Sequence, residues 1–158
     1  MGLATRDVYA RLKEKFPQGV EVVESPGEPF CVVETAALLE VCRFLKETPE
    51  LSFDYLACQS GADDTVNFWS IYHLYSVAKN HRAVLKVKLP HDDSASVSSV
   101  CDLWPGANWH ERETFDMYGI RFEGHPDHRR ILLPEDWPGY PLRKDYDFPD
   151  HYQGIPLK

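Results

Sequence analysis

Apolar and polar positions in the first third of the chain predict two helices and two short strands. Apolar residues recur at helical spacing before Pro17 and again after residue 35, and two short apolar runs flank a Pro- and Gly-rich turn between them. The expected elements are a helix Arg6–Phe16, strands Val20–Glu24 and Phe30–Glu34, and a helix Ala36–Lys46, with Thr5 and Thr35 as the helix caps.

From Phe53 onward the pattern changes to that of β-structure. We expect strands Tyr55–Gln59, Val66–Ser76 and Ala83–Leu89, with a polar turn Ser60–Asp64 after the first. The strand Val66–Ser76 is apolar on both faces, which favours a central strand or one covered on both sides. Its two faces carry Phe68, Tyr72 and Leu74 on one side, and Trp69, Ile71 and Tyr75 on the other.

The last part of the chain predicts two short helices followed by extended structure. Val97, Val100 and Trp104 fit a helix Ser96–Trp104. Asn108 is a suitable N-cap for a second helix, Asn108–Tyr118, which Gly119 would end in a left-handed conformation. Six of the twelve prolines lie between Pro126 and Pro156, which excludes a regular helix or a central strand there.

These elements predict an α+β fold. A mixed or antiparallel sheet with packed helices would be followed by an extended Pro-rich C-terminal ribbon. We expect a domain over residues 1–132 and an extended arm over residues 133–158. A chain of 158 residues with 43% apolar and 27% charged residues is long enough to build one substantial core.

Charge and cysteine usage exclude several classes of protein. A net charge of -8 argues against nucleic-acid binding and against an anionic membrane surface. No apolar run approaches the length of about 18 residues that a membrane span needs, and the N-terminus carries no apolar signal core. The four cysteines form no CxxC pair, so we expect small buried side chains in a reducing compartment at positions Cys31, Cys42, Cys58 and Cys101.

The helix Asn108–Tyr118 is polar on nearly every side. Such a helix does not obtain its stability from an apolar face of its own, so its charges need partners. We expect a buried salt-bridge network in which arginines pair with the helix carboxylates. The carboxylates are Glu111, Glu113 and Asp116, and the arginines are Arg112, Arg121, Arg129, Arg130 and Arg143.

No catalytic or metal site is expected. Glu111 and Glu113 are two positions apart on a helix and point about 200° apart, so they cannot share a substrate. His125 and His128 are separated by Pro126, which prevents a helical ligand pair, and we expect His125 to bind backbone within the ribbon instead. Neither a phosphate loop, nor a dinucleotide fingerprint, nor a nucleophile motif is present.

Consecutive motifs between Trp109 and Tyr146 resemble one family. The motifs are Glu111-Arg112-Glu113, Asp116-Met117-Tyr118-Gly119-Ile120, Phe122-Glu123-Gly124-His125-Pro126, Arg130-Ile131-Leu132 and Gly139-Tyr140-Pro141-Leu142-Arg143-Lys144-Asp145-Tyr146. They resemble the 30 kDa subunit of respiratory NADH:quinone oxidoreductase (complex I). A weaker resemblance extends back to about Phe53, and His128 stands where the family often has leucine.

The resemblance implies a structural subunit without cofactors in the hydrophilic arm of a proton-translocating complex that passes electrons from NADH to quinone. Flavin, iron–sulfur clusters and the quinone site would belong to other subunits. The chain would bind chiefly the 49 kDa-type subunit and cluster-bearing neighbours, on the cytoplasmic face of the bacterial inner membrane, and would touch the membrane only through partners. The implied motif and interface residues are Glu111, Arg112, Glu113, Asp116, Gly119, His125, Pro126, Arg130, Pro141, Leu142, Arg143, Lys144, Asp145 and Tyr146.

Two other functions stay open at this point. The same motifs fit the related subunit of a membrane-bound hydrogenase or another donor-linked dehydrogenase. A free-standing metal-dependent hydrolase would use His125, Asp127 and His128.

The ribbon itself carries a further expectation. From Leu133 to Lys158 it should be a binding arm that is poorly ordered in the isolated subunit. Its apolar side chains would be the interface anchors: Trp137, Tyr140, Leu142, Tyr146, Phe148 and Tyr152.

Overall fold

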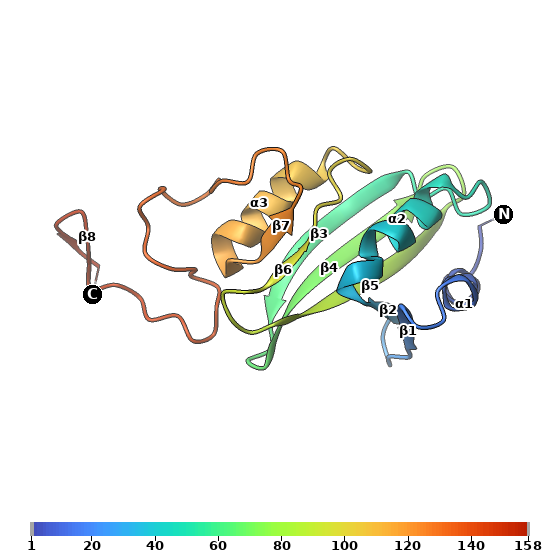
Figure 1. The fold of residues 1–158 in the computed structure, drawn as a ribbon, viewed down its shortest axis with the longest axis horizontal. Coiled ribbons are helices and arrows are strands. Elements are labelled where there is room, and N and C mark those ends of the chain that lie inside the picture. Colours follow the sequence, from blue (N-terminus) through green and yellow to red (C-terminus); the bar gives the residue numbers. More distant parts are fainter. Residues whose placement is uncertain (1, 158) are drawn as a thin grey trace.

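A five-stranded mixed sheet forms the centre of the computed structural model, which describes residues 2–157 (Figure 1). The strands lie in the order β1-β2-β5-β4-β3, and only the β2–β5 pair is parallel. Their bounds are β1 Val20–Val23, β2 Phe30–Val33, β3 Tyr55–Asp63, β4 Asn67–Ser76 and β5 His81–Pro90. This architecture confirms the predicted α+β class.

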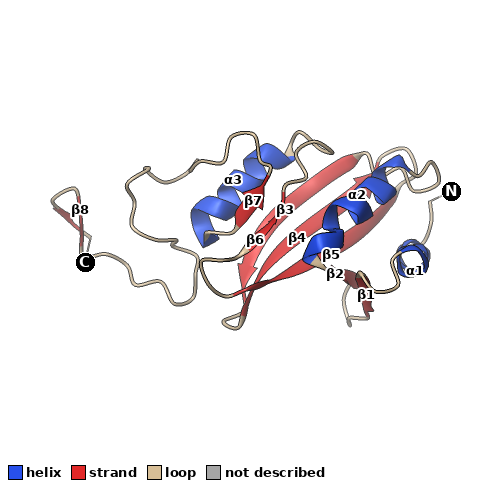
Figure 2. Cartoon of the chain, in the orientation of Figure 1, coloured by secondary structure: helices blue, strands red, loops and turns tan. Residues whose placement is uncertain are grey.

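Three α-helices accompany the sheet. Helix α1 (Thr5–Lys15) packs against β1 and β5, and α3 (Ala107–Tyr118) packs against β3. Helix α2 (Leu38–Glu47) follows a single 3-10 turn, η1 (Thr35–Ala37), and, like α3, is drawn in front of the sheet (Figure 2). No helix among the described residues has the length and apolar character to cross a bilayer.

Two small pairs of strands complete the chain. Strand β6 (Ser96–Ser98) pairs in parallel with β7 (Arg121–Glu123), and β8 (His151–Tyr152) forms a hairpin with β9 (Ile155–Pro156). Within the described chain, residues 124–150 contain no helix or strand. This part leads away from the sheet to the hairpin, at the opposite end of the molecule from the N-terminus (Figure 1).

The predicted alternation of buried and exposed residues is confirmed in the sheet. On β4, the face with Phe68, Tyr72 and Leu74 is buried, whereas Trp69, on the other face, is half-buried. The strand lies inside the sheet, between β3 and β5. On β5 and α2 the expected residues are also buried: Ala83, Leu85, Val87, Leu89, Leu38, Val41, Cys42 and Leu45. Cys31 and Cys101 are buried free thiols as well, while Cys58 is partly exposed.

The predicted turn Ser60–Asp64 is wrong, because β3 continues to Asp63. The chain reverses only after Asp63, where the carboxylate of Asp64 accepts the N–H groups of Val66 and Asn67 at 3.0 and 2.6 Å. The polar residues that suggested a turn lie on a strand at the margin of the sheet. Exposure there makes polar side chains acceptable in a strand.

The predicted helix Ser96–Trp104 is also wrong. Residues 96–98 form β6, and a turn follows in which the Trp104 N–H donates to Val100 O at 2.9 Å. The apolar residues that gave the helical spacing are buried as expected, namely Val97, Val100, Cys101 and Trp104. A strand followed by a tight turn buries the same positions, so the spacing alone did not separate the two conformations.

None of the three predicted side-chain caps forms. Helix α1 begins at Thr5 itself, and Thr35 lies within the 3-10 turn. Helix α3 has Gly106 at its N-cap, and Asn108 lies inside the first turn. The predicted end of this helix is confirmed, because Gly119 adopts φ +76 in the left-handed region.

Candidate functional site

Helix α3 is held closely against β3. The Thr114 hydroxyl donates to Gln59 Oε1 at 3.0 Å, and the Gln59 amide donates to Ser70 Oγ at 3.0 Å. A Cβ atom at Gly61 would collide with the ring of Tyr118, so glycine at this strand position permits the close approach of the helix. The contact fixes the position of α3 on the sheet.

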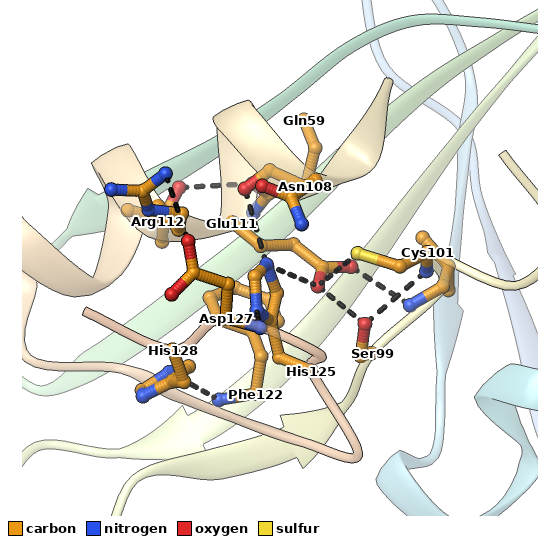
Figure 3. A network of polar contacts seen from close by, with 12 residues as sticks. Gln59, Ser99, Cys101, Asn108, Glu111, Arg112, Phe122, His125, Asp127 and His128 are labelled. Atoms are coloured by element: carbon orange, nitrogen blue, oxygen red, sulfur yellow. Dashed lines mark hydrogen bonds and ion pairs between the residues drawn. The ribbon is translucent and has the colours of Figure 1, made fainter. Parts of the chain in front are cut away.

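Glu111 is fully buried between α3 and the segment after β6 (Figure 3). Its carboxylate accepts hydrogen bonds from Ser99 Oγ at 2.6 Å, from the Val100 N–H at 2.8 Å and from Cys101 Sγ at 3.3 Å. Burial raises the pKa of Glu111, against the opposing effect of these hydrogen bonds. Burial likewise raises the pKa of Cys101 to about 12, so Cys101 remains a thiol donor. No arginine of the described chain pairs with Glu111, which corrects the expected partner for this carboxylate.

His125 joins the loop after β7 to α3. Its Nε2 donates to the Asn108 carbonyl at 3.1 Å, and its Nδ1 accepts the Asp127 N–H at 2.9 Å (Figure 3). Both bonds together require the neutral tautomer with the proton on Nε2. His125 was predicted to bind backbone within the ribbon, and it does so by accepting the Asp127 N–H. Its bond to the Asn108 carbonyl on α3 was not predicted.

Arg112 anchors the chain that follows His128. The guanidinium donates to the carbonyl groups of Arg129 and Arg130 at 3.1 and 3.0 Å, and lies 3.4 Å from the Asp127 carboxylate. The Arg112 side chain is only 6% exposed. A buried guanidinium that satisfies two carbonyls and a carboxylate fixes the path of the loop on the helix surface.

Asp116 anchors the next three residues. One of its carboxylate oxygens accepts the consecutive N–H groups of Ile131, Leu132 and Leu133 at 3.0, 2.7 and 2.9 Å. The other pairs with Arg130 at 2.7 Å. Burial alone would raise the pKa of Asp116, but the hydrogen bonds from the Leu133 N–H and Arg130 hold it below its usual value.

Arg143 returns to the end of α3 at Gly119. Its Nε donates to Tyr118 O at 2.7 Å, and its Nη1 pairs with Asp93 at 2.8 Å. The guanidinium lies over the ring of Tyr140, 4.5 Å from the centroid. Any Cβ at Gly119 would collide with Arg143 and Tyr140, so Gly119 serves both the left-handed turn and this packing.

A second contact holds residue 144 at the end of β3. The Asp63 carboxylate accepts the Lys144 N–H at 2.7 Å and lies 3.0 Å from His91 Nε2. The hydrogen bond from His91 to Asp63 raises the pKa of His91, and the nearby charge of Asp145 adds to this effect. The segment 129–144 is therefore tied to its own domain at both ends.

Aromatic residues beyond Lys144 form a separate cluster with Trp137. Trp137 lies 5.8 Å from Phe148 and 4.9 Å from Tyr152, between ring centroids, and its Nε1 donates to the Tyr146 hydroxyl at 3.1 Å. The Tyr152 hydroxyl donates to Asp136 at 2.7 Å. This cluster gives the C-terminal hairpin its contacts to the preceding loop.

The structure divides the predicted motif residues into three groups. Those that anchor the loop and segment on the domain are Glu111, Arg112, Asp116, Gly119, His125, Arg130 and Arg143, as the contacts above show. Pro141 and Tyr146 are half-buried. The exposed ones are Glu113, Pro126, Leu142, Lys144 and Asp145. The prediction of buried ionic contacts is confirmed for Arg112 and Asp116, whereas Glu113 is exposed.

Several residues of the site were missed from the sequence. Ser99 was assigned to a predicted helix, so its contact with Glu111 could not be inferred from the sequence. Asp63 was assigned to a predicted turn, so its contact with Lys144 could not be inferred either. Asp93 and Gln59 were likewise not expected to hold the segment or the helix, and Asn108 was expected as a helix cap rather than as a partner of His125.

In the loop after β7, the side chains that could hold a metal ion are already engaged in contacts with other described residues. Cys101, Glu111 and His125 have donor atoms within 4.8 Å of one another, but both ring nitrogens of His125 are already engaged. His128 Nε2 accepts the Phe122 N–H at 3.1 Å, and Asp127 pairs with arginines. The donor set required for the hydrolase alternative is thus used to fold the loop.

Comparisons with known proteins agree on one family. A family model described as "Respiratory-chain NADH dehydrogenase, 30 Kd subunit" matches residues 31–152. An NADH-quinone oxidoreductase subunit of Chlorobium phaeobacteroides is 44% identical over 152 residues, covering 93% of this chain and 91% of the relative. Its counterpart in Chloroherpeton thalassium is 43% identical over 150 residues, and the match covers 93% of this chain but 62% of that relative.

A solved structure has the same fold. The structure described as the membrane-bound sulfane sulfur reductase (MBS), an archaeal respiratory membrane complex, contains a chain with a TM-score of 0.74 and 26% identity to this one. The match covers 90% of this chain and 85% of that chain.

Proposed function

The chain belongs to the family of the 30 kDa subunit of respiratory-chain NADH dehydrogenase, and from this premise we propose that it is a cofactor-free structural subunit of a proton-translocating NADH:quinone oxidoreductase. In this proposal it braces the subunits that carry the iron–sulfur clusters and the quinone site. It contributes no catalytic residue of its own to electron transfer from NADH to quinone.

The observation that carries this proposal is how the motif charges are used. Arg112, Asp116 and Arg143 bind backbone groups of the segment 129–144 and of α3, so these charges serve to hold the segment on the helix. The same folding leaves large apolar side chains outside. Leu132 is 61% and Leu142 is 49% exposed, and Trp109 and Phe148 are also exposed. Exposed apolar side chains of this kind suit an interface with a partner protein.

We place the partner at the C-terminal segment, residues 133–158. The segment would bind the 49 kDa-type subunit, with residues 133–144 fixed on the domain and the aromatic cluster around Trp137 reaching outward. The domain over residues 1–132 would remain on the side of the cluster-bearing neighbours. The complex would hold the chain as a peripheral protein on the cytoplasmic face of the bacterial inner membrane.

The proposal is tested by replacing the exposed apolar residues. The variant Phe148→Asp/Ile155→Asp should lower co-purification of the 49 kDa-type partner by about tenfold or more, because two exposed apolar residues of the C-terminal segment become charged. Val77→Asp is the matched control, since Val77 is 66% exposed and lies in the turn between β4 and β5. Equal recovery of this partner with the double variant, the control and the natural chain would overturn the proposed interface.

A second candidate function is the corresponding subunit of a respiratory complex with a different electron donor or acceptor. It is favoured by the structural likeness to the sulfane sulfur reductase complex, at 26% identity. The curated relatives named for NADH and quinone are more similar, at 43% and 44% identity, and favour the first candidate. Quinone reduction by NADH in the purified complex separates the two.

A further inference from the structure

We propose that the free edge of β3 is a strand-addition site for an extended segment of another subunit of the complex. This inference rests on the proposed function, because it requires the chain to work inside an assembly. It adds an interface at β3, which meets the C-terminal segment only at Leu142 of the groove wall. It also names the mode of binding, which is backbone pairing.

The direction of the backbone groups on β3 follows from the hairpin at its end. The Asp64 N–H donates to Asn67 O at 3.1 Å, so Asp64 and Asn67 form a hydrogen-bonded pair. Antiparallel pairs alternate between the bonded and non-bonded type, so the residues at every second position from Asp64 bond to β4. In the register of β3 on β4, Gln59, Gly61 and Asp63 therefore point their N–H and C=O groups away from β4.

Two features of the neighbouring strands agree with this alternation. Pro90 lies opposite Asn67, at a non-bonded position where its missing N–H costs nothing. Val84 points away from β4, and its N–H donates to the Tyr9 hydroxyl at 2.8 Å. On β3, by contrast, the outward backbone groups of residues 59, 61 and 63 have no backbone partner among residues 2–157.

The two edges of the sheet differ in their protection. Strand β1 has four residues, and Lys13 Nζ donates to the Val20 carbonyl at 2.8 Å. Strand β3 has nine residues with neither lysine nor proline, and its one irregularity lies near its start, between Leu56 and Cys58. Short length, lysine and proline are the usual means of blocking an edge, so residues 58–63 present an unblocked edge.

A groove runs along this edge. Its walls are the consecutive residues 58–61 on one side, and His110, Glu113, Met117 and Leu142 on the other. Successive strand residues face opposite sides of a sheet, so only a groove that follows the backbone edge touches four in a row. Its volume is about 360 Å³, and its surface beside the edge is formed by α3.

The side chains of the groove indicate the chemistry of the occupant. Glu113 is exposed and has no hydrogen bond or ion pair with another described residue. An added strand that carries lysine or arginine opposite Glu113, and an apolar residue against Met117 and Leu142, would satisfy both walls. A second copy of this chain is a poor match, because it brings a net charge of -8 to the same acidic edge.

Hydrogen exchange with residue resolution tests the proposal in the purified complex. The amides of Gln59, Gly61 and Asp63 should exchange about a hundredfold more slowly in the complex than in the isolated chain, because they gain a strand partner. Cys58, Ser60 and Ala62 are the internal control, since they bond to β4 and should be slow in both samples.

Four results would overturn the strand-addition site. Fast exchange of Gln59, Gly61 and Asp63 in the complex, with residues 133–157 protected there, removes the site but leaves the proposed function intact. Slow exchange in the isolated chain that does not depend on concentration means that the chain covers its own edge. Slow exchange that strengthens with concentration in the isolated chain means that a second copy occupies it. Absence of protection at both β3 and residues 133–157 would count against the proposed function itself.

A charge variant provides an independent readout. Glu113→Lys should reduce incorporation into the complex by about tenfold, because it opposes the basic residue of the added strand. Glu14→Lys makes the same charge change at an exposed position on α1, distant in sequence from Glu113. This control variant should incorporate normally. Equal incorporation of both variants would show that no basic segment lies opposite Glu113.

Discussion

At the scale of single residues, charges of one kind have different roles within a single helix. Glu111 is buried and receives only neutral donors, whereas Glu113, two positions on, faces solvent. Arg112 binds two carbonyl groups and a carboxylate of the following loop. The sequence indicated that the charged side chains of this helix need partners. Which of these side chains are buried depends on how the following loop folds over the helix.

Arg112 gives the clearest prediction at this scale. Arg112→Ala should lower the free energy of unfolding by about 3–5 kcal/mol, because the carbonyl groups of Arg129 and Arg130 both lose a buried charged donor. Arg129→Ala is the matched control, since Arg129 also pairs with Asp127, at 2.9 Å, but is 63% exposed. The control should cost about 0–1 kcal/mol, as surface pairs do. Urea denaturation of both variants measures the difference, and equal costs would show that the Arg112 contacts contribute nothing beyond a surface pair.

At the scale of elements, the sequence predicted the sheet better than its connections. Alternating residues such as Leu85 and Val87 report burial directly, and the strand positions followed from them. The segment Ser96–Trp104 failed because its strand is fixed by pairing with β7, which is distant in sequence. The end of α3 at Gly119 succeeded because a left-handed turn has a local requirement for glycine.

Gly119 also connects α3 to the C-terminal segment, which gives a prediction for this scale. Gly119→Ala and Gly124→Ala both place alanine in the left-handed region, at φ +76 and +80, which costs about 1–2 kcal/mol. A Cβ at Gly124 meets nothing within 4 Å, but at Gly119 it displaces Arg143 and Tyr140. We therefore expect Gly119→Ala to be more destabilising than Gly124→Ala by about 1–3 kcal/mol, from overpacking. Thermal or urea unfolding of the two variants measures this difference. Equal losses of stability would mean that Arg143 and Tyr140 move aside without cost.

At the scale of the whole molecule, the chain combines a folded domain with a segment that is held at its beginning and extends at its end. Asp116 and Asp63 hold residues 131–133 and 144 on the domain. The hairpin β8–β9 lies far from the sheet (Figure 1), and Ile155 on it is 62% exposed. The Pro-rich composition indicated an irregular segment, but the anchors on α3 could not be predicted, because they depend on contacts formed by the tertiary fold. The poor order expected for residues 133–158 in the isolated subunit remains a prediction.

The central claim is that the C-terminal segment binds a partner subunit while the domain holds it in place. Removing residues 148–158 tests this most directly, because the hydrogen bonds of Arg112, Asp116, Arg143 and Asp63 to the segment all lie within residues that remain. The measurement is the amount of partner subunits recovered with the tagged truncated chain, beside its unfolding midpoint. The account predicts an unchanged midpoint and a recovery lowered by about tenfold or more, through loss of the exposed aromatic and aliphatic anchors. A truncated chain that folds normally and recovers its partners as fully as the intact chain would contradict it.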